Sequence, residues 1–344
     1  FQPKYTITDL LLANIKRINA LVMEFNQRRF PEVILLELER VAREISTHAS
    51  TSIEGNPLPL TEVKKILKNR PEQLRSSEQE VNNYNEALTW LNERLNKKEV
   101  NLSLDLILTI QKMVTKKLLP DFESGRFRQK PVVVNDPRTR KTVYLPPDAK
   151  DVPGLMGQLV DFVIQNQFRV DSLILAGIFH KQIVIIHPFM DGNGRTTRLA
   201  TKILLAAMGL NTFNLFSFEN YYNQNVTKYF QTVGELGNYY DLASKINFTD
   251  WLEYFTGGII DELLRVQKIL PQVAISPTSQ LQSYHLKILD YIKETGFIAN
   301  RDYGKLTDRA KATRAQDFQK LISLGLIERQ GKGKATYYRL AKTK

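Results

Sequence analysis

The sequence predicts a mainly α-helical protein that carries one β-hairpin and a small second domain. Apolar residues recur at three- and four-residue spacing through most of the 344 residues, which is the period of an amphipathic helix. Between residues 130 and 147, KPVVV, NDPRTR and KTVYLPP read as strand, turn and strand. PQVAISPTSQ at residues 271–280 contains two prolines and small polar residues, which is typical of a linker.

The first expected domain spans residues 1–270 and is mostly helical. The expected helices cover residues 10–25, 33–50, 76–96, 103–118, 171–187, 196–208, 218–235 and 248–269. Segment 171–187 is apolar almost all round, so we expect its helix at the centre of the domain. One hairpin in a helical chain cannot bury itself, so we expect the hairpin at 130–147 to lie over another feature.

The second expected domain spans residues 281–344, after the linker at 271–280. Helices are expected near residues 282–295, 302–308 and 311–324, followed by a strand, a Gly/Lys turn and a strand. This order resembles a winged helix-turn-helix domain, whose third helix and wing contact DNA. The resemblance indicates the following DNA-contacting residues: Arg309, Lys311, Arg314, Lys332 and Lys334. The alternative is a protein-contact module whose lysines face solvent.

Composition narrows the class of protein. Hydrophobic residues are 42% and charged residues 24% of the chain, as in ordinary globular proteins, and no apolar run is long enough to span a membrane. The chain has no cysteine, so disulfides and cysteine-bound metals are excluded, and a cytoplasmic location is expected. The net charge is +12, and residues 281–344 carry 14 Lys/Arg against 6 Asp/Glu, which is +8. This basic segment indicates a polyanion partner or a solvated face.

The most informative stretch is HPFMDGNGRTTR, residues 187–198. A buried helix is expected to end at His187, and a new one to open near Arg195. Glycines and a helix N-terminus together suit an anion, because backbone N–H groups there approach phosphate oxygens closely. Asp191 suits Mg²⁺ and His187 suits a general base. Taken singly, each residue could be structural, but together they favour phosphoryl or nucleotidyl transfer.

The same stretch closely resembles the HPFx[D/E]GNGRxxR motif of Fic domains, and GRFR at 125–128 with VYLPP at 143–147 resembles the flap of that family. The resemblance covers roughly residues 30–260. It implies a Fic-type helical domain with a β-hairpin flap, and transfer of AMP from ATP to a Ser, Thr or Tyr hydroxyl of a target protein or of the chain itself.

The resemblance also assigns roles. It implies that His187 is the catalytic base and that Asp191 holds Mg²⁺, the expected cofactor. The implied nucleotide-binding residues are Gly192, Asn193, Gly194, Arg195, Arg198 and Tyr229. The implied target-docking residues of the flap are Val132, Val133 and Val134, which would offer backbone hydrogen bonds to an extended segment. The family often has Glu where this chain has Val184, and Gly where it has Thr197.

A second motif predicts how the activity is restrained. Residues 50–56, STSIEGN, fit the (S/T)xxxE(G/N) inhibitory motif of Fic proteins. The resemblance implies that Glu54 pairs with Arg198 and keeps that arginine from the γ-phosphate of ATP. The alternative is a surface glutamate in a turn that ends a helix. A function of another class also stays open, that of a DNA-binding regulator whose Fic domain senses nucleotide. A homodimer is also possible from the sequence.

Overall fold

The computed structural model of the protein describes residues 1–27, 32–69, 71–135, 141–207, 215–274, 281–331 and 333–341. The chain divides into two compact units. The larger unit contains residues 1–29 and 38–266, and the smaller unit contains residues 30–37 and 267–344. Within the described ranges, no helix is both long and apolar enough to cross a membrane.

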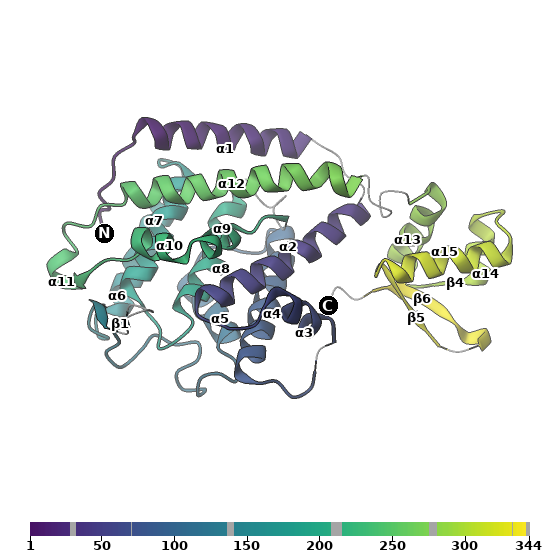
Figure 1. Ribbon diagram of the computed structural model, residues 1–344, viewed down its shortest axis with the longest axis horizontal. Helices are drawn as coiled ribbons and strands as arrows, with labels where there is room; N and C mark the ends of the chain where they lie inside the picture. Colours follow the sequence, from purple (N-terminus) through teal and green to yellow (C-terminus); the bar gives the residue numbers. More distant parts are fainter. Residues whose placement is uncertain are drawn as a thin grey trace. The chain divides into compact units, whose positions relative to one another are not determined.

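Helices make up most of the larger unit, which confirms the mainly helical prediction (Figure 1). Its helices are α1 (Asp9–Gln27), α2 (Glu32–Ile53), α3 (Leu60–Asn69), α4 (Ser76–Asn96), α5 (Leu104–Val114), α6 (Val152–Asn166), α7 (Ser172–Ile186), α8 (Asn193–Ala207), α9 (Phe218–Gln224), α10 (Val226–Val233), α11 (Tyr239–Leu242) and α12 (Thr249–Ala274). Its strands are β1 (Val134–Asn135), β2 (Thr142–Leu145) and β3 (Gly237–Asn238).

Helix α7 lies in the core of the larger unit, as its apolar sequence predicts. Thirteen of its fifteen residues are buried. It packs closely on α12, where a Cβ at Gly177 would lie 2.5 Å from the Leu252 side chain, so only glycine permits this approach. The Trp251 indole donates to the Gly177 carbonyl oxygen at 2.7 Å. The end of α7, which begins the HPFMDGNGRTTR stretch, is therefore anchored in the core.

The elements differ from the sequence prediction in several places. Helix α8 begins at Asn193, three residues before the expected start at 196, because the Asn193 side chain closes the preceding turn. Helix α6 was not expected, and Asn225 divides the segment 218–235 into α9 and α10. Helix α12 continues to Ala274, so the first four residues of the expected linker are helical. Residues 275–280 lie outside the described ranges.

The predicted hairpin is present as an antiparallel pair. Val134 of β1 faces Tyr144 of β2, and Asn135 faces Thr142. Its turn, residues 136–140, lies outside the described ranges. Strand β2 also pairs in parallel with β3, which gives the strand order β1-β2-β3 and leaves β1 at an edge. The Tyr144 hydroxyl donates to the carbonyl oxygen of Ile185 in α7 at 3.0 Å, so the hairpin lies over the end of the core helix.

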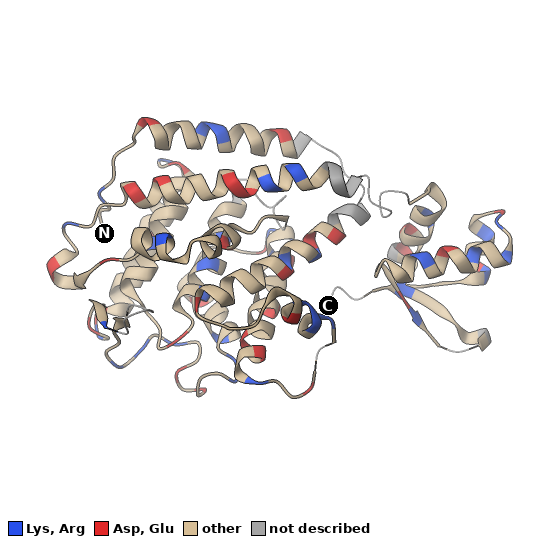
Figure 2. Cartoon of the chain, viewed as in Figure 1, with Lys and Arg blue, Asp and Glu red and all other residues tan. Residues whose placement is uncertain are grey.

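The smaller unit has its own apolar core and a three-stranded sheet. Its elements are α13 (Ser283–Thr295), β4 (Ile298–Ala299), α14 (Asn300–Leu306), α15 (Lys311–Ser323), β5 (Ile327–Gln330), the 3-10 turn Gly333–Ala335 and β6 (Tyr337–Leu340). The strand order is β4-β6-β5, and β4 was not expected. Ile288, Ile298, Phe318 and Leu321 are fully buried between the helices and the sheet. Lys and Arg positions outnumber acidic ones in this unit (Figure 2).

Candidate active site

The turn between α7 and α8 gathers the predicted site residues. His187 ends α7 in the left-handed conformation, with φ at 49°, and Gly192 takes φ at 77° just before α8. The Asn193 side chain holds the turn closed: its Oδ1 accepts from the Phe189 N–H and its Nδ2 donates to the Phe189 carbonyl oxygen, both at 2.9 Å. The amide of Asn193 therefore fixes the loop, and is not free for the phosphate that the sequence analysis assigned to it.

Arg128 braces this turn from the flap side, a role that the sequence analysis missed. Its side chain is 2% exposed, and its Nε donates to the His187 carbonyl oxygen at 2.8 Å. Its Nη1 donates to the Lys130 carbonyl oxygen at 3.2 Å, and its backbone N–H donates to the Pro188 carbonyl oxygen at 2.9 Å. One buried guanidinium thus connects the end of α7 to the segment that precedes β1. The GRFR match contained this residue, but only the fold reveals its backbone partners.

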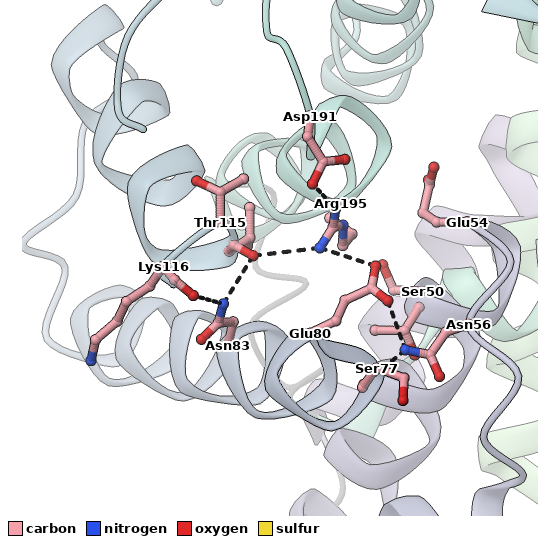
Figure 3. Close-up of polar contacts among 12 residues, drawn as sticks. Ser50, Glu54, Asn56, Ser77, Glu80, Asn83, Thr115, Lys116, Asp191 and Arg195 are labelled. Atoms are coloured by element: carbon pink, nitrogen blue, oxygen red, sulfur yellow. Dashed lines mark hydrogen bonds and ion pairs between the residues drawn. The ribbon is translucent and has the colours of Figure 1, made fainter. Parts of the chain in front are cut away.

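Arg195 and Asp191 form the first ion pair of the site. Arg195 Nη2 lies 2.7 Å from Asp191 Oδ2, one turn back along the chain. Its Nη1 lies 3.0 Å from Glu80 Oε1 of α4, and the Arg195 side chain is only 4% exposed (Figure 3). The sequence analysis assigned both Arg195 and Arg198 to nucleotide binding. In the structure their surroundings differ, because Asp191 and Glu80 already pair with Arg195.

Glu80 is a second residue that the sequence analysis missed. It lies on α4 one turn before Tyr84, and both residues face the interior. Burial raises the pKa of Glu80, although the neighbouring Arg195 favours its ionised form. Helical periodicity places Glu80 on the buried face of α4, but no sequence pattern indicates that the acid meets an arginine more than 100 residues later.

Arg198 faces the end of α2, as predicted. Its Nη2 lies 2.7 Å from Glu54 Oε1, and its Nε donates to Ser50 Oγ at 2.8 Å. The Arg198 side chain is fully buried, whereas that of Glu54 is 30% exposed. Burial is the largest single influence on Arg198 and opposes its charge, but Glu54, Tyr229 and Tyr84 together outweigh burial and raise the arginine pKa. The structure therefore contains the Glu54–Arg198 pair that the inhibitory motif implies.

The Glu54 carboxylate also occupies the space directly in front of the α8 N-terminus. A Cβ placed on Gly194 would collide with Glu54 Oε1 and would lie 2.8 Å from Arg198 Nη1. The first N–H groups of a helix lack intrahelical acceptors and attract anions. In this conformation the anion at the N-terminus of α8 is the side chain of Glu54.

His187 is suited to accept a proton. Burial is the main cause that lowers its pKa from 6.5 to about 4, so the imidazole is neutral near pH 7. Its Nδ1 is buried and has no hydrogen-bond partner among the described residues. His180 lies seven residues earlier in α7, and its surroundings differ. It is fully buried, and its ring nitrogens lie 3.0 Å from Thr201 Oγ1 and 3.1 Å from the Tyr229 hydroxyl.

Tyr229 lies behind the site and not on its surface. It is 1% exposed, and its ring stacks on Tyr222 with centroids 4.5 Å apart. Its hydroxyl contacts His180. The sequence analysis counted Tyr229 among the nucleotide-binding residues, whereas in the structure its ring packs against Tyr222 and Trp251. A tyrosine in an amphipathic segment gives no signal that separates these two positions.

The flap residues divide in the structure. Val134 belongs to β1, whereas Val132 and Val133 precede the strand. Val133 is 48% exposed, and the other two are half-buried. Because β1 is an edge strand, its outer side is open to another extended segment.

In the smaller unit, the predicted DNA-contacting residues differ in availability. Arg309 is paired with Asp317 at 2.8 Å and covers the ring of Tyr284. Arg314 bonds Asn300 and the Arg309 carbonyl oxygen, both at 3.1 Å, so its guanidinium is engaged against α14. Both guanidinium groups are thus engaged within the unit, and their contact with DNA stays a prediction. Lys311 is exposed at the start of α15, Lys332 lies outside the described residues, and Lys334 is described only by its backbone.

Comparison with known proteins agrees with this arrangement. Residues 101–205, which extend from just before α5 to nearly the end of α8, match the Fic/DOC family. A protein named protein adenylyltransferase Fic from Nematostella vectensis is 30% identical over 164 residues, 46% of this chain and 36% of that protein. Its namesake from Aedes aegypti is 29% identical over 220 residues, 58% of this chain and 42% of that protein. The chain thus spans well under half the length of these relatives.

A solved structure shares the fold. The crystal structure of a Fic family protein from Desulfovibrio desulfuricans G20 has a TM-score of 0.65 and 22% identity, and the match covers 100% of this chain and 99% of that one. The larger unit therefore has a mainly helical Fic-type fold. Residues 101–205 match the Fic/DOC family, and the chain is a distant homologue of the proteins named protein adenylyltransferase Fic.

Proposed function

We propose that the protein is a self-inhibited adenylyltransferase, which transfers AMP from ATP to a hydroxyl of a target protein or of the chain itself. The observation that carries the proposal is the turn between α7 and α8. It brings a neutral histidine, a half-exposed aspartate and a helix N-terminus together within twelve residues of a Fic/DOC domain. Nucleotide sensing alone would need an anion site, but no proton acceptor beside it.

In the proposed reaction, the hydroxyl oxygen attacks the α-phosphorus of ATP. The new oxygen–phosphorus bond forms as the bond from the α-phosphorus to the bridging oxygen breaks, and pyrophosphate leaves. The hydroxyl proton passes to His187, whose lowered pKa keeps a nitrogen free to accept it at neutral pH. The backbone N–H groups of Gly194 and Arg195, at the start of α8, stabilise the negative charge of the phosphates. Gly192 gives the backbone the turn that aims them.

The residues present fit a magnesium ion held jointly with a triphosphate. The Asp191 side chain is 45% exposed, and its Oδ2 pairs with Arg195. Among the described residues, Oδ1 of Asp191 forms no ion pair or hydrogen bond. Mg²⁺ is commonly bound by one or two carboxylates together with substrate phosphates. Among the described residues, no cluster of three or more His, Asp or Glu forms a cage of its own. When bound, Mg²⁺ would neutralise phosphate charge, and Arg195 would orient the Asp191 carboxylate.

Self-inhibition follows from the Glu54–Arg198 pair. Arg198 is the cation of α8 whose guanidinium meets the anion site, since Arg195 is enclosed by Asp191 and Glu80. While Glu54 holds Arg198, the γ-phosphate lacks its positive partner and meets a carboxylate instead. Productive binding therefore requires Glu54 to leave.

Intact-mass spectrometry after incubation with ATP and Mg²⁺ tests the proposal. Glu54→Gly should gain the mass of one or more adenylyl groups, the wild type should gain much less, and Glu54→Gly/His187→Ala should gain none. Equal labelling of the wild type and Glu54→Gly would reject self-inhibition. Absence of labelling on both the chain and added lysate proteins would reject AMP transfer.

A second proposal concerns the smaller unit, which we propose to be a winged-helix domain that contacts DNA. Residues 281–344, which form most of this unit, carry 14 Lys/Arg against 6 Asp/Glu, and this charge supports a polyanion partner. Arg301 and Lys311 are exposed on α14 and α15 and are the cations to test first. Fluorescence anisotropy with random duplex DNA should show binding that weakens steeply with salt, and Arg301→Ala/Lys311→Ala should reduce the salt slope. No binding at low salt would favour a protein-contact module.

A further inference from the structure

The turn that carries Glu54 contacts the site at a second point. This inhibitory turn, residues 54–56, follows α2 directly. At one end, Glu54 Oε1 lies 2.7 Å from Arg198 Nη2. At the other, Asn56 Nδ2 donates to Glu80 Oε2 at 2.6 Å and to the Ser77 carbonyl oxygen at 2.9 Å (Figure 3). The turn is thus attached to both α8 and the first turns of α4.

We call Asn56 the clamp residue, because its side chain bonds the inhibitory turn to α4 and to the backbone that follows the turn. Its side chain is 9% exposed, and its Oδ1 accepts from the Leu58 N–H at 3.1 Å. Its backbone N–H donates to the Thr51 carbonyl oxygen at 3.1 Å, which ties it to the end of α2. Every polar group of the side chain has a partner, and the donor that reaches Glu80 makes a charge-assisted bond. Such bonds are stronger than neutral ones.

Glu80 connects this clamp to the proposed metal ligand. Its two oxygens have separate partners, because Oε2 accepts from Asn56 while Oε1 pairs with Arg195 at 3.0 Å. Arg195 in turn pairs with Asp191 at 2.7 Å. A continuous chain of contacts therefore runs from the inhibitory turn through α4 to the loop before α8 (Figure 3).

We propose that Asn56 and Glu80 are positioning residues that hold the inhibitory turn in the closed state. Asn56 docks the turn on α4, and Glu80 presents the oxygen that receives it while Arg195 keeps Glu80 in place. Because Asn56 lies two residues from Glu54, loss of the Asn56 contacts lets Glu54 leave Arg198. The effect on the turn stands on the geometry alone, whereas the effect on activity rests on the proposed adenylyltransferase function.

The test is Asn56→Asp in the full-length chain. The substitution keeps the acceptor for Leu58, but removes both donated bonds and places a second carboxylate beside Glu80. The matched control is Asn82→Asp, because Asn82 Nδ2 donates to Glu86 Oε1 at 2.8 Å on the same helix, in a contact exposed to solvent. Loss of a hydrogen bond to a charged group corresponds to a factor of roughly ten or more in the open fraction of the turn.

Two measurements are made on each variant: hydrogen exchange of the backbone amides of residues 54–56 and 58, and labelling with ATP and Mg²⁺ by intact mass. Asn56→Asp should exchange these amides about tenfold faster than the wild type and should label faster although Glu54 is intact. Asn82→Asp should match the wild type in both. Unchanged exchange in Asn56→Asp would overturn the clamp, whatever the labelling shows.

The double variant Asn56→Asp/Glu80→Gln exchanges donor and acceptor. The new amide can donate to position 56 and still accept from Arg195, so exchange and labelling should return toward the wild type. Glu80→Gln alone should open the turn, because either orientation of its amide sets donor against donor at Asn56 or Arg195. This single variant serves if Asn56→Asp does not fold.

The outcomes separate the clamp from the function. Labelling of Glu54→Gly without labelling of Asn56→Asp would overturn the clamp's control of activity and leave the adenylyltransferase proposal intact. No labelling of Glu54→Gly would reject the adenylyltransferase proposal, while hydrogen exchange would still decide whether Asn56 and Glu80 hold the turn.

Discussion

Arg195 and Arg198 lie one turn apart on α8, yet their surroundings differ in kind. Arg195 is held by Glu80 from the first turns of α4 and by Asp191 from its own loop. Arg198 is held by Glu54, which lies on a turn just past the end of α2 and is 30% exposed. Glu80 lies within a helix and Asp191 in the loop that the Asn193–Phe189 hydrogen bonds close, whereas Glu54 lies on a short turn outside any helix. In the proposed function, Arg195 is therefore structural and Arg198 is the point of regulation.

The largest effect expected from this comparison is on catalysis. In the active Glu54→Gly background, Arg198→Ala should lower the labelling rate by on the order of 100-fold, because a phosphate-stabilising donor would be lost. Arg198→Lys should restore only part of the rate, since an ammonium lacks the planar fork. Quench-flow or timed mass spectrometry gives the rates. A loss below threefold in Arg198→Ala would show that this arginine does not act on the phosphates.

The next effect concerns stability and contrasts the two acids directly. Glu80→Ala leaves the buried Arg195 with one carboxylate fewer and should cost about 3 kcal/mol of unfolding free energy. Glu54→Ala leaves the buried Arg198 guanidinium with its two bonds to Ser50 and removes a carboxylate that is 30% exposed, so it should cost less, roughly 1.5 kcal/mol. Urea denaturation of both variants compares them. Equal losses would contradict the division into a structural and a regulatory arginine.

Arg128→Ala should produce an effect of intermediate size on stability. It leaves the carbonyl oxygens of His187 and Lys130 without their donor, at a cost of roughly 2 kcal/mol. Because the His187 turn would also lose its brace, labelling in the Glu54→Gly background should fall, and saturating ATP should not rescue it. Rescue by ATP would place the role of Arg128 in nucleotide binding.

The smallest expected effect is that of pH. The pKa of His187 is lowered from 6.5 to about 4, mainly by burial, so the imidazole stays unprotonated as pH falls from 7.5 to 6. Labelling by Glu54→Gly should therefore change by less than about twofold over that range. Removal of Glu54 should lower the His187 pKa further, because the negative charge of Glu54 favours the protonated ring. Half-maximal loss near pH 6.5 would contradict the lowered pKa.

The sequence predicted the parts of the fold and site that depend on local pattern. The apolar run of α7 and the hairpin pairing agree with the structure, because periodicity and turn residues carry them. The Glu54–Arg198 pair is also present, but only the resemblance to the Fic inhibitory motif implied it, since the two residues lie far apart in the sequence. The partners of Arg195 and Arg128 could not be predicted. They depend on which buried faces meet across long separations, and neither a single acid on a helix nor an arginine before a strand indicates its partner.

The same limit applies to residues whose intramolecular partners the sequence did not reveal. Arg309 and Arg314 look like exposed cations in a basic segment, but Asp317 and Asn300 lie where the fold brings helices α14 and α15 together. The Asn193 amide looks free in GNG, but it reaches back to Phe189. A motif identifies which residues matter, whereas only the packed chain decides which of their atoms remain available.

The paired hydrogen bonds between Asn193 and Phe189 have a consequence for the affinity of the loop for an anion. Two hydrogen bonds of 2.9 Å close the loop on itself, and the Phe189 ring stacks on Phe127 in the core with centroids 5.9 Å apart. The loop thus has a fixed shape before any ligand arrives, and little of its conformational entropy would be lost on binding. In the proposed function, this largely buried turn would bind an anion without first having to be ordered by it.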